Sequence, residues 1–344
     1  MELVNTELNI FCPRKSCIHY QEPANPTWKK GTYPVLSEEE RRQLFWCSGG
    51  KHKFSETSFS DLWHKHGSFK EYEQTAKLLK CGLATVEIAD VLQKDERTIC
   101  TWKQAISSKS QAFHLWICCQ IGIIVSFLQM DELWSYVCNK SRQLWVFAAL
   151  DVPTRFWITL VTGKRTSTIA KRLVGHVYDL GTWSKHRLLR ITTDKLAAYT
   201  HAISTYFQED VRYVYLQIVK QRVKRRLKTV SKAFIQGGQD DFPTGTQNTS
   251  FIERLNLTIR DRVSYLCRKT MGYCKKSEAM DQTLLINLVD YNYCCFHKSL
   301  RVRLPGCPKQ LFKKRYRMST PAMKMGLSND RLNWKYLFLI PVPS

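Results

Sequence analysis

Acidic residues are scarce in this 344-residue chain, which has 29 Asp and Glu against 53 Lys and Arg and a net charge of +24. The imbalance is local: residues 1–110 hold 16 basic and 14 acidic residues, whereas residues 111–344 hold 37 and 15. Such a charge makes a polyanion such as nucleic acid the expected partner of the later part of the chain. An apolar fraction of 44% allows real cores to be buried and excludes an intrinsically disordered protein.

Internal repeats and low-complexity segments are also missing, so a fibrous protein is excluded, and the length predicts two or three domains. The first residues show no secretory signal pattern, so the 13 cysteines are expected to be thiols or metal ligands in a reducing compartment. We therefore expect a cytoplasmic, nucleoid-associated protein. The uncharged segment 110–130 is long enough to span a bilayer, but polar residues interrupt it, and a linker helix followed by a buried strand explains it better.

Residues 1–60 carry cysteine and histidine side chains at a spacing that suits zinc. Cys12 and Cys17 are separated by four residues, and Cys47 is followed by His52 after a stretch that contains Lys, Gly and Pro. Two such turns with a hairpin's length of chain between them are typical of a zinc ribbon, in which the metal replaces a hydrophobic core. The alternative is a set of unrelated cysteines without a metal.

The fourth ligand of such a ribbon is not fixed by the sequence. Gly50 stands where a second cysteine is usual, which departs from the stronger pattern of two cysteine pairs. His52 is the expected substitute, with His19 as the second choice.

Residues 66–108 fit three short amphipathic helices separated by two turns, which is a helix-turn-helix pattern. Asp95 is expected to cap the third helix, which would then lie in a DNA major groove. A generic three-helix core is the alternative. The residues expected to face the groove are Arg97, Thr98, Thr101 and Lys103.

From residue 121 the sequence alternates between strands and helices. Three β-rich runs joined by short turns predict an antiparallel meander at 123–137, 143–152 and 156–164. Two more strands, at 186–194 and 211–219, are separated by helices, and a long helix is expected from about 249 to 267. This order predicts a multidomain α/β protein with a mixed sheet covered on both faces. The expected boundaries are 121–300 for this domain, with a loop-like basic insertion at 220–247, and 301–344 for a basic C-terminal tail.

Three acidic residues lie where this order can bring distant segments together: Asp131, Asp194 and Glu253. They converge only if the first and fourth strands of the sheet are neighbours. Three carboxylates at one place repel each other unless divalent cations hold them. We therefore expect two Mg²⁺ or Mn²⁺ ions, which can activate the attacking oxygen and stabilise the leaving oxygen of a phosphoryl displacement. Helix caps or surface charges are the alternative explanation of these acids.

The segments around the three acids resemble the catalytic blocks of one family. QMDELWSYV around Asp131, ITTDKLAAY around Asp194 and NTSFIERLNLTIR around Glu253 are similar to those of DDE transposases of the insertion-sequence-one type, the InsA and InsB proteins and their single-chain relatives. RKTMGYCKKSEA, NYCCFHKSLR and TPAMKMGL extend the similarity along the chain. Two departures are Cys274, where serine is usual, and the lack of an arginine-proline pair before His297.

The resemblance implies an RNase-H-like catalytic domain in which Asp131 and Asp194 bind the metals and Glu253 completes the site. It also implies an oligomeric transposase that binds the terminal inverted repeats of a mobile element, cleaves DNA and transfers the strand to target DNA. Two alternatives are a DNA-binding regulator without catalysis and a structure-specific nuclease on the same fold. Asp151 is assigned to a turn, and Glu132 to the opposite face of its strand, so neither is expected at the metals.

Basic residues just before the last helix, and on it, are expected to contact DNA. The segment 220–228 carries six positive charges in nine positions, for which a solvated surface is the alternative. On the helix, Arg260 follows Glu253 by two turns, so both lie on one face with Asn256 between them, where it could bind a phosphate or orient the glutamate. These candidates are Lys220, Arg222, Lys224, Arg225, Arg226, Lys228, Asn256 and Arg260.

Overall fold

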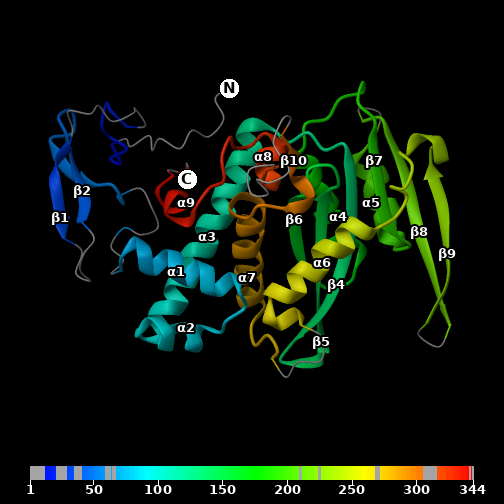
Figure 1. The fold of residues 1–344 in the computed structure, drawn as a ribbon, viewed down its shortest axis with the longest axis horizontal. Coiled ribbons are helices and arrows are strands. Elements are labelled where there is room, and N and C mark those ends of the chain that lie inside the picture. Colours follow the sequence, from blue (N-terminus) through cyan, green and yellow to red (C-terminus); the bar gives the residue numbers. More distant parts are fainter. Residues whose placement is uncertain are drawn as a thin grey trace.

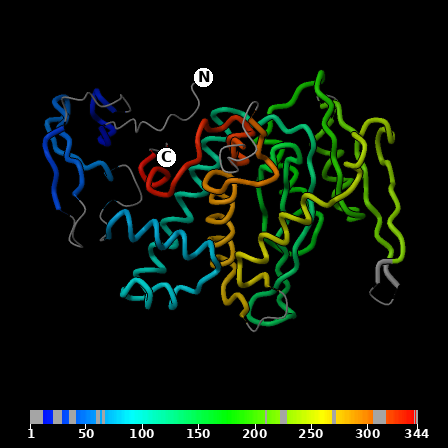
Figure 2. Tube along the Cα trace, viewed as in Figure 1, coloured from blue at the N-terminus to red at the C-terminus, as the bar shows by residue number. Residues whose placement is uncertain are grey.

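The computed structural model combines a six-stranded sheet, a set of helices around it and a small three-stranded sheet near one end (Figures 1 and 2). The residues that it describes are 12–20, 29–34, 41–58, 63, 67–208, 211–223, 226–267, 272–304, 316–340 and 342, without the side chains of 222–227.

The large sheet is mixed, and its strand order is β6-β5-β4-β7-β8-β9. The first three of its strands form the predicted antiparallel meander, while β7 runs parallel to both β4 and β8. The first and fourth strands of the domain are therefore neighbours, as the convergence of the acids required. The strands are β4 (Phe127–Val137), β5 (Asn139–Asp151), β6 (Phe156–Gly163), β7 (Leu189–Asp194), β8 (Tyr213–Val223) and β9 (Arg226–Gln236).

The sixth strand, β9, was not predicted. It pairs antiparallel with β8, so the expected loop-like insertion at 220–247 instead contains a long hairpin. The prediction of a loop was wrong because a run of positive charges hid the β-branched residues between them. An edge strand tolerates such charges, since they remain in water and discourage pairing with other chains.

The helices α5 (Ala197–Tyr206) and α6 (Ser250–Arg262) cover opposite faces of the sheet, and α4 (Ser167–Leu180) packs beside α5. Phe147 of β5 contacts Tyr199 of α5, and the next residue, Ala148, pairs with Asp131 of β4. Because side chains alternate along a strand, Asp131 points to the face that α6 covers. In Figure 1, α6 crosses in front of the sheet.

The predicted helix-turn-helix segment forms α1 (Phe69–Lys80), α2 (Thr85–Leu92) and the start of α3 (Glu96–Ile121). Asp95 caps α3 as expected, since its Oδ1 accepts a hydrogen bond of 2.8 Å from the Arg97 amide. The third helix and the expected linker helix are one element. Among the described residues, no helix is both long and apolar enough to cross a membrane.

Lys103 does not face a groove, so this prediction was wrong. It is buried, and its Nζ donates a hydrogen bond of 3.2 Å to the Ala279 carbonyl of α7 (Ser277–Val289). The cause is that α3 packs along α7, and the lysine lies on the packed face next to Trp102. Arg97 and Thr101 are exposed, and Thr98 is half-buried.

The C-terminal segment, which we expected to be a basic tail, contains two helices that pack against the rest of the chain. Its helices α8 (Pro321–Met325) and α9 (Trp334–Leu339) pack into the same hydrophobic core as the sheet and α1. Tyr72 of α1 stacks on Trp102 at 4.4 Å between ring centroids and meets Phe338 edge-on at 6.0 Å. The positive charges of the segment had concealed the apolar spacing of α9. In the chain, the short strands β10 (Val302–Arg303) and β11 (Tyr316–Arg317) come after α7 and before α8.

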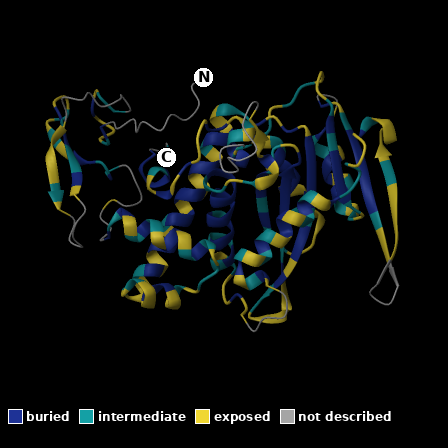
Figure 3. Ribbon diagram, viewed as in Figure 1, coloured by how far each residue is buried: buried dark blue, intermediate teal, exposed yellow. Residues whose placement is uncertain are grey.

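The small sheet contains β1 (Lys29–Pro34), β2 (Arg41–Cys47) and β3 (His52–Ser55) in that order. Among the described residues of this segment only a few apolar side chains are buried, chiefly Phe45 and Phe54, whose rings stack 5.3 Å apart, together with three cysteines. Figure 3 shows how exposed β1 is compared with the central sheet. So small a core needs another source of stability.

Candidate active site

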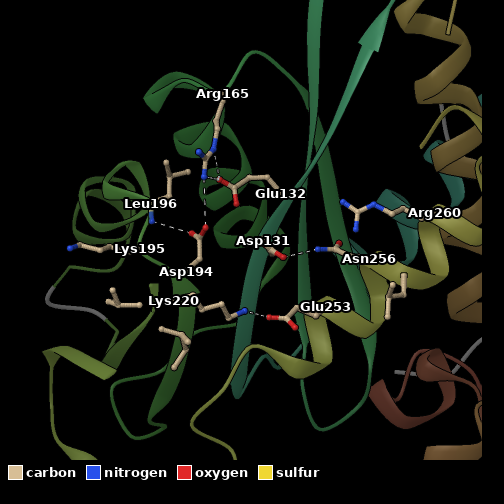
Figure 4. Close-up of a pocket in the computed structure, with 13 residues that line it drawn as sticks. Asp131, Glu132, Arg165, Asp194, Lys195, Leu196, Lys220, Glu253, Asn256 and Arg260 are labelled. Atoms are coloured by element: carbon tan, nitrogen blue, oxygen red, sulfur yellow. Dashed lines mark hydrogen bonds and ion pairs between the residues drawn. The ribbon is translucent and has the colours of Figure 1, made fainter. Parts of the chain in front are cut away.

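Asp131, Asp194 and Glu253 converge on one pocket of about 600 Å³, which Asn256 and Arg260 also line (Figure 4). The first comes from β4, the second from the end of β7, and the third from α6. The parallel register of β4 and β7 explains the first two. Met130 pairs with Thr193, so the next residues along each strand are the two aspartates.

Glu132 also belongs to this site, although we expected it to point away. Carboxylate oxygens of Asp131, Glu132 and Asp194 lie within 4.8 Å of one another. Glu132 does leave β4 on the opposite face from Asp131, as alternation requires. However, β7 ends at Asp194, so no strand separates the two faces here and the longer side chain reaches the pocket. The prediction failed because it treated the sheet as continuous.

Arg165 links the carboxylates at this end of the sheet. Its Nη2 lies 3.1 Å from Glu132 and 3.7 Å from Asp194. Across the pocket, Lys220 forms an ion pair with Glu253, and the Thr249 hydroxyl donates a hydrogen bond of 2.7 Å to the same carboxylate. Lys220, which we predicted to contact DNA, therefore neutralises a site carboxylate in this structure.

Asn256 holds Asp131 in place. It is buried, and its Nδ2 donates a hydrogen bond of 2.8 Å to the Asp131 carboxylate. Its Oδ1 is also buried and has no hydrogen-bond partner among the described residues. The expectation that Asn256 orients Glu253 was wrong in its partner, because one helical turn beyond Glu253 places the amide next to Asp131 of β4. A contact of Asn256 with DNA stays a prediction.

Gln129 positions α6 against β4, and nothing in the sequence reasoning identified it. This fully buried side chain accepts a hydrogen bond of 2.9 Å from the Ile252 amide and donates one of 2.7 Å to the Asn248 carbonyl. Both partners are at the start of α6, next to Glu253. A glutamine within an apolar strand, two residues before an aspartate on the same face, is the signal that would have revealed it.

The carboxylates interact electrostatically and lie in a poorly solvated place. Burial, and then repulsion from Asp194 and Glu253, raises the pKa of the Asp131 carboxyl to about 6. Burial and the charges of Asp194 and Asp131 raise the pKa of Glu132 to about 8, although Arg165 opposes this. A cluster of carboxylate oxygens with excess negative charge suits a hard divalent cation such as Mg²⁺ or Mn²⁺.

Asp151 has a structural role, as its assignment to a turn implied. Its carboxylate accepts hydrogen bonds from the amides of Ser126, Phe127 and Thr154 and from the Thr154 hydroxyl. This network ties the end of β5 to the start of β4 and keeps Asp151 away from the pocket.

Of the remaining DNA-binding candidates, Lys228 is exposed on β9, while the side chains of Arg222, Lys224, Arg225 and Arg226 lie outside the described residues. Figure 4 shows Arg260 and Asn256 on the same side of α6.

The predicted zinc ligands form a second cluster, in the small sheet. The Sγ atoms of Cys17 and Cys47 are 3.5 Å apart, and the Cys12 Sγ is 3.6 Å from the His52 Nε2. Cys12, Cys47 and His52 offer ligand atoms within 4.8 Å of one another. These separations suit Cys12, Cys47 and His52 as three ligands of one tetrahedral zinc ion, with the Cys17 Sγ beside Cys47 as the expected fourth.

Gly50 explains why histidine completes this cluster. A Cβ at position 50 would lie 2.5 Å from the His52 Nδ1 and 3.2 Å from the Cys17 Sγ. The imidazole therefore occupies the space that a cysteine at position 50 would need. The Gly50 amide also donates a hydrogen bond of 3.3 Å to the Cys47 Sγ.

The fold and the pocket together define a mixed α/β domain with an acidic site at the end of its parallel strands. Residues 123–238 of this domain match the family model described as IS1 transposase. Insertion element IS1 4 protein InsB of Escherichia coli (strain K12) is 26% identical over 163 residues, which are 47% of this chain and 72% of that protein. Insertion element IS1 protein InsB of Shigella flexneri is 27% identical over 158 residues, 45% of this chain and 88% of the relative. These matches, each over less than half of the chain, support an IS1-like transposase family member.

Solved structures give only distant likenesses. A piggyBac transposase synaptic complex with hairpin DNA has a TM-score of 0.36 at 13% identity, over 64% of this chain and 63% of that one. A simian T-cell lymphotropic virus intasome in complex with PP2A regulatory subunit B56 gamma has a TM-score of 0.32 at 17% identity, over 65% and 59%. This chain thus spans less than two thirds of each, and likenesses at this level define neither the fold nor the site.

The raised pKa values predict how stability depends on pH. Folded Asp131 and Glu132 bind protons more tightly than the unfolded chain does, so their contribution to stability is lost as pH rises from about 4 to about 6 for Asp131 and to about 8 for Glu132. Each group changes the free energy of unfolding by at most about 1.4 kcal/mol per pH unit. Thermal unfolding without added Mg²⁺ should show that the stability of the wild type declines as pH rises. The decline should be smaller in Asp131→Asn and in Glu132→Gln. Asp330→Asn, at an exposed carboxylate, is the control, and equal declines in all four proteins would contradict the prediction.

Proposed function

We propose that this chain is a DDE transposase that cleaves DNA at the ends of a mobile element and transfers the strand to target DNA. The observation that carries the proposal is the convergence of Asp131, Asp194 and Glu253 from three separate elements on one pocket. The similarity to InsB proteins supports it. A regulator that only bound DNA would have no use for a strained acidic pocket, which burial and repulsion make costly to maintain.

Asp131 and Asp194, with Glu132 beside them and Glu253 across the pocket, are the residues that would hold Mg²⁺ or Mn²⁺. Such ions supply activation of the attacking oxygen and stabilisation of the leaving oxygen in phosphodiester cleavage. The donor set is entirely oxygen, which fits these cations. Asn256 fixes the orientation of Asp131 through a hydrogen bond to one of its carboxylate oxygens.

The cations of the pocket have a second role when DNA arrives. Arg165 and Lys220 pair with site carboxylates in this structure and would be released when these carboxylates gain other partners. Both side chains could then form ion pairs with the phosphates on either side of the scissile bond. Arg260, on the rim of the same pocket, adds a guanidinium whose planar donors match a phosphate.

The amino-terminal segments are proposed to bind the element ends. The small sheet would hold one Zn²⁺ through Cys12, Cys17, Cys47 and His52, and the exposed Arg97 and Thr101 at the start of α3 would contact a DNA groove. Two ends must be brought together for strand transfer, so an oligomer is expected.

The catalytic assignment predicts that Asp131→Asn, Asp194→Asn and Glu253→Gln each lower nicking of a terminal inverted repeat in Mg²⁺. The loss should exceed about 100-fold, since changes in groups that only orient metal ligands already cost up to that factor. DNA binding measured in Ca²⁺ should remain. Nicking is followed on a labelled duplex by denaturing electrophoresis. The control is Asp151→Asn, which changes a buried carboxylate outside the pocket and should retain nicking. Wild-type nicking by the Asp131 or Asp194 variant would contradict the assignment.

The helix geometry predicts a difference between two arginines of α6. Arg260 lines the acidic pocket, whereas Arg262 points elsewhere and pairs with Asp290 at 3.3 Å. Arg260→Ala should lower nicking about tenfold or more, because a charged hydrogen bond to phosphate is lost. Arg262→Lys, which retains the charge beside Asp290, is the matched control and should nick at nearly the wild-type rate. Equal losses in both variants would mean that α6 presents another face to DNA.

The cysteine cluster predicts that the purified full chain contains about one equivalent of zinc. Cys17→Ser and His52→Ala should lower the zinc content measured by elemental analysis, because each removes one of four ligands. Cys81→Ser, at an exposed cysteine of the turn after α1, should retain the metal. A wild-type chain without zinc would show that the cluster is not a metal site.

A further inference from the structure

A second pocket, of about 670 Å³, lies on the other side of α6 from the acidic site. Arg254, Thr258 and Arg262 of α6 form one wall, and the segment 295–299 after α7 forms another. This segment belongs to NYCCFHKSLR, which the catalytic assignment leaves without a role. No acidic residue is among the described residues that line the pocket, although four cationic side chains are: Arg155, Arg254, Arg262 and Lys298.

The four cations differ in how far their charge is already compensated. Arg262 pairs with the buried Asp290 at 3.3 Å, and Arg155 packs over the Phe251 ring at 3.7 Å while it donates a hydrogen bond to a backbone carbonyl. Arg254 and Lys298 are exposed, and neither forms an ion pair with another described residue. The free charge of the pocket is therefore at its rim, where a ligand would arrive.

The interior of the pocket adds polar groups but no free charge of its own. His297 packs edge-on against Tyr291 at 4.4 Å and stays neutral, because burial, with help from Arg262 and Arg155, lowers its pKa to about 4. The hydroxyl side chains of Ser250 and Ser299 add polar groups at the wall. Fixed cations with hydroxyls and without carboxylates are suited to an anion such as a phosphate.

We propose that this pocket binds backbone phosphates of the DNA whose scissile bond lies in the acidic pocket, so it rests on the proposed function. Glu253 and Arg254 are consecutive residues that line the two pockets on either side of one helix. A helix is about 10 Å wide, a distance that a DNA strand covers in about three phosphates at 3.4 Å each along the axis. One duplex can therefore cross the exposed ridge of α6 and engage both pockets.

The test replaces the two uncompensated cations in the full chain, as Arg254→Ala with Lys298→Ala. Binding of a labelled duplex is measured by fluorescence anisotropy in Ca²⁺ over a range of salt, for an inverted repeat and for a random sequence. We expect affinity to fall about tenfold for both, and the slope of log K against log salt to decrease by up to about 1.8, or 0.9 for each lost contact.

Two matched variants separate charge from folding. Arg254→Lys with Lys298→Arg retains the charges and should restore the wild-type slope. Lys171→Ala with Arg187→Ala removes the same two kinds of charge from exposed positions outside both pockets and should leave affinity and slope unchanged. Equal weakening by the two alanine pairs, or an unchanged slope in the Arg254 and Lys298 pair, would overturn the proposal.

Two further arms identify the anion. The first arm measures the melting temperature with inorganic phosphate in the wild type and in the Arg254→Ala, Lys298→Ala variant. If phosphate stabilises only the wild type while both proteins bind DNA equally, the pocket is a small-anion site and the proposal fails. It also fails if polyglutamate binding, but not DNA binding, is lost in the alanine pair. Asp131→Asn should bind DNA with the full slope. Normal nicking by the wild type combined with an unaffected alanine pair would overturn this inference alone, whereas absence of nicking by the wild type would contradict the proposed function.

Discussion

Mutual repulsion among carboxylates at the open end of β4 and β7 is the constraint that the rest of the site accommodates. The parallel register of the two strands places Asp131 and Asp194 side by side, and α6 brings Glu253 to the same pocket. Cations compensate this charge from both sides, with Arg165 at one and Lys220 at the other. Polar groups fix the geometry, because Asn256 holds Asp131 and Gln129 holds the start of α6. Removing one of these partners would leave a buried charge or amide unsatisfied.

A second buried carboxylate connects α6 to the amino-terminal helices. Asp290, almost fully buried after α7, accepts from Lys80 of α1 at 3.0 Å, from Arg262 of α6 at 3.3 Å and from the Cys295 thiol at 2.9 Å. The segment α1 to α3 is therefore anchored to the same helix that carries Glu253. It also shares the hydrophobic core of the large sheet, so it is packed against the sheet and is not separately tethered.

Much of this arrangement could be predicted from the sequence, and the failures have identifiable causes. Periodicity predicted the strands, and the convergence of the acids required β4 and β7 to be neighbours, while helical phase placed Arg260 with Glu253. Predictions from strand alternation and helical periodicity failed where the neighbouring strand ends or where distant segments pack together. Strand alternation excluded Glu132 because it ignores where the neighbouring strand ends. The roles of Lys103 and Gln129 depend on packing between distant segments, which no local pattern encodes.

Charge runs were the other source of error. The basic stretch that was expected to be a loop forms β9, and the expected tail contributes α9 to the core. In both segments positive residues occupy exposed positions between apolar or β-branched ones, so composition indicated solvent exposure while periodicity indicated structure. In a chain whose later part is strongly basic, the composition indicates a polyanionic partner. The spacing of the apolar residues indicates the secondary structure.

The helix α6 carries both an apolar face that packs on the sheet and charged side chains suited to a partner. Its buried residues, such as Ile252 and Leu255, fix it against the sheet, and this leaves only two sides of the helix open to polar chemistry. On one side lies Glu253 among carboxylates, and on the other lies Arg254 among cations. A site that only concentrates carboxylates repels DNA, whereas a site that only concentrates cations binds DNA without reacting with it. Under the proposed function, placing both on one helix would allow the positive side to hold the polyanion while the negative side meets a single phosphodiester bond.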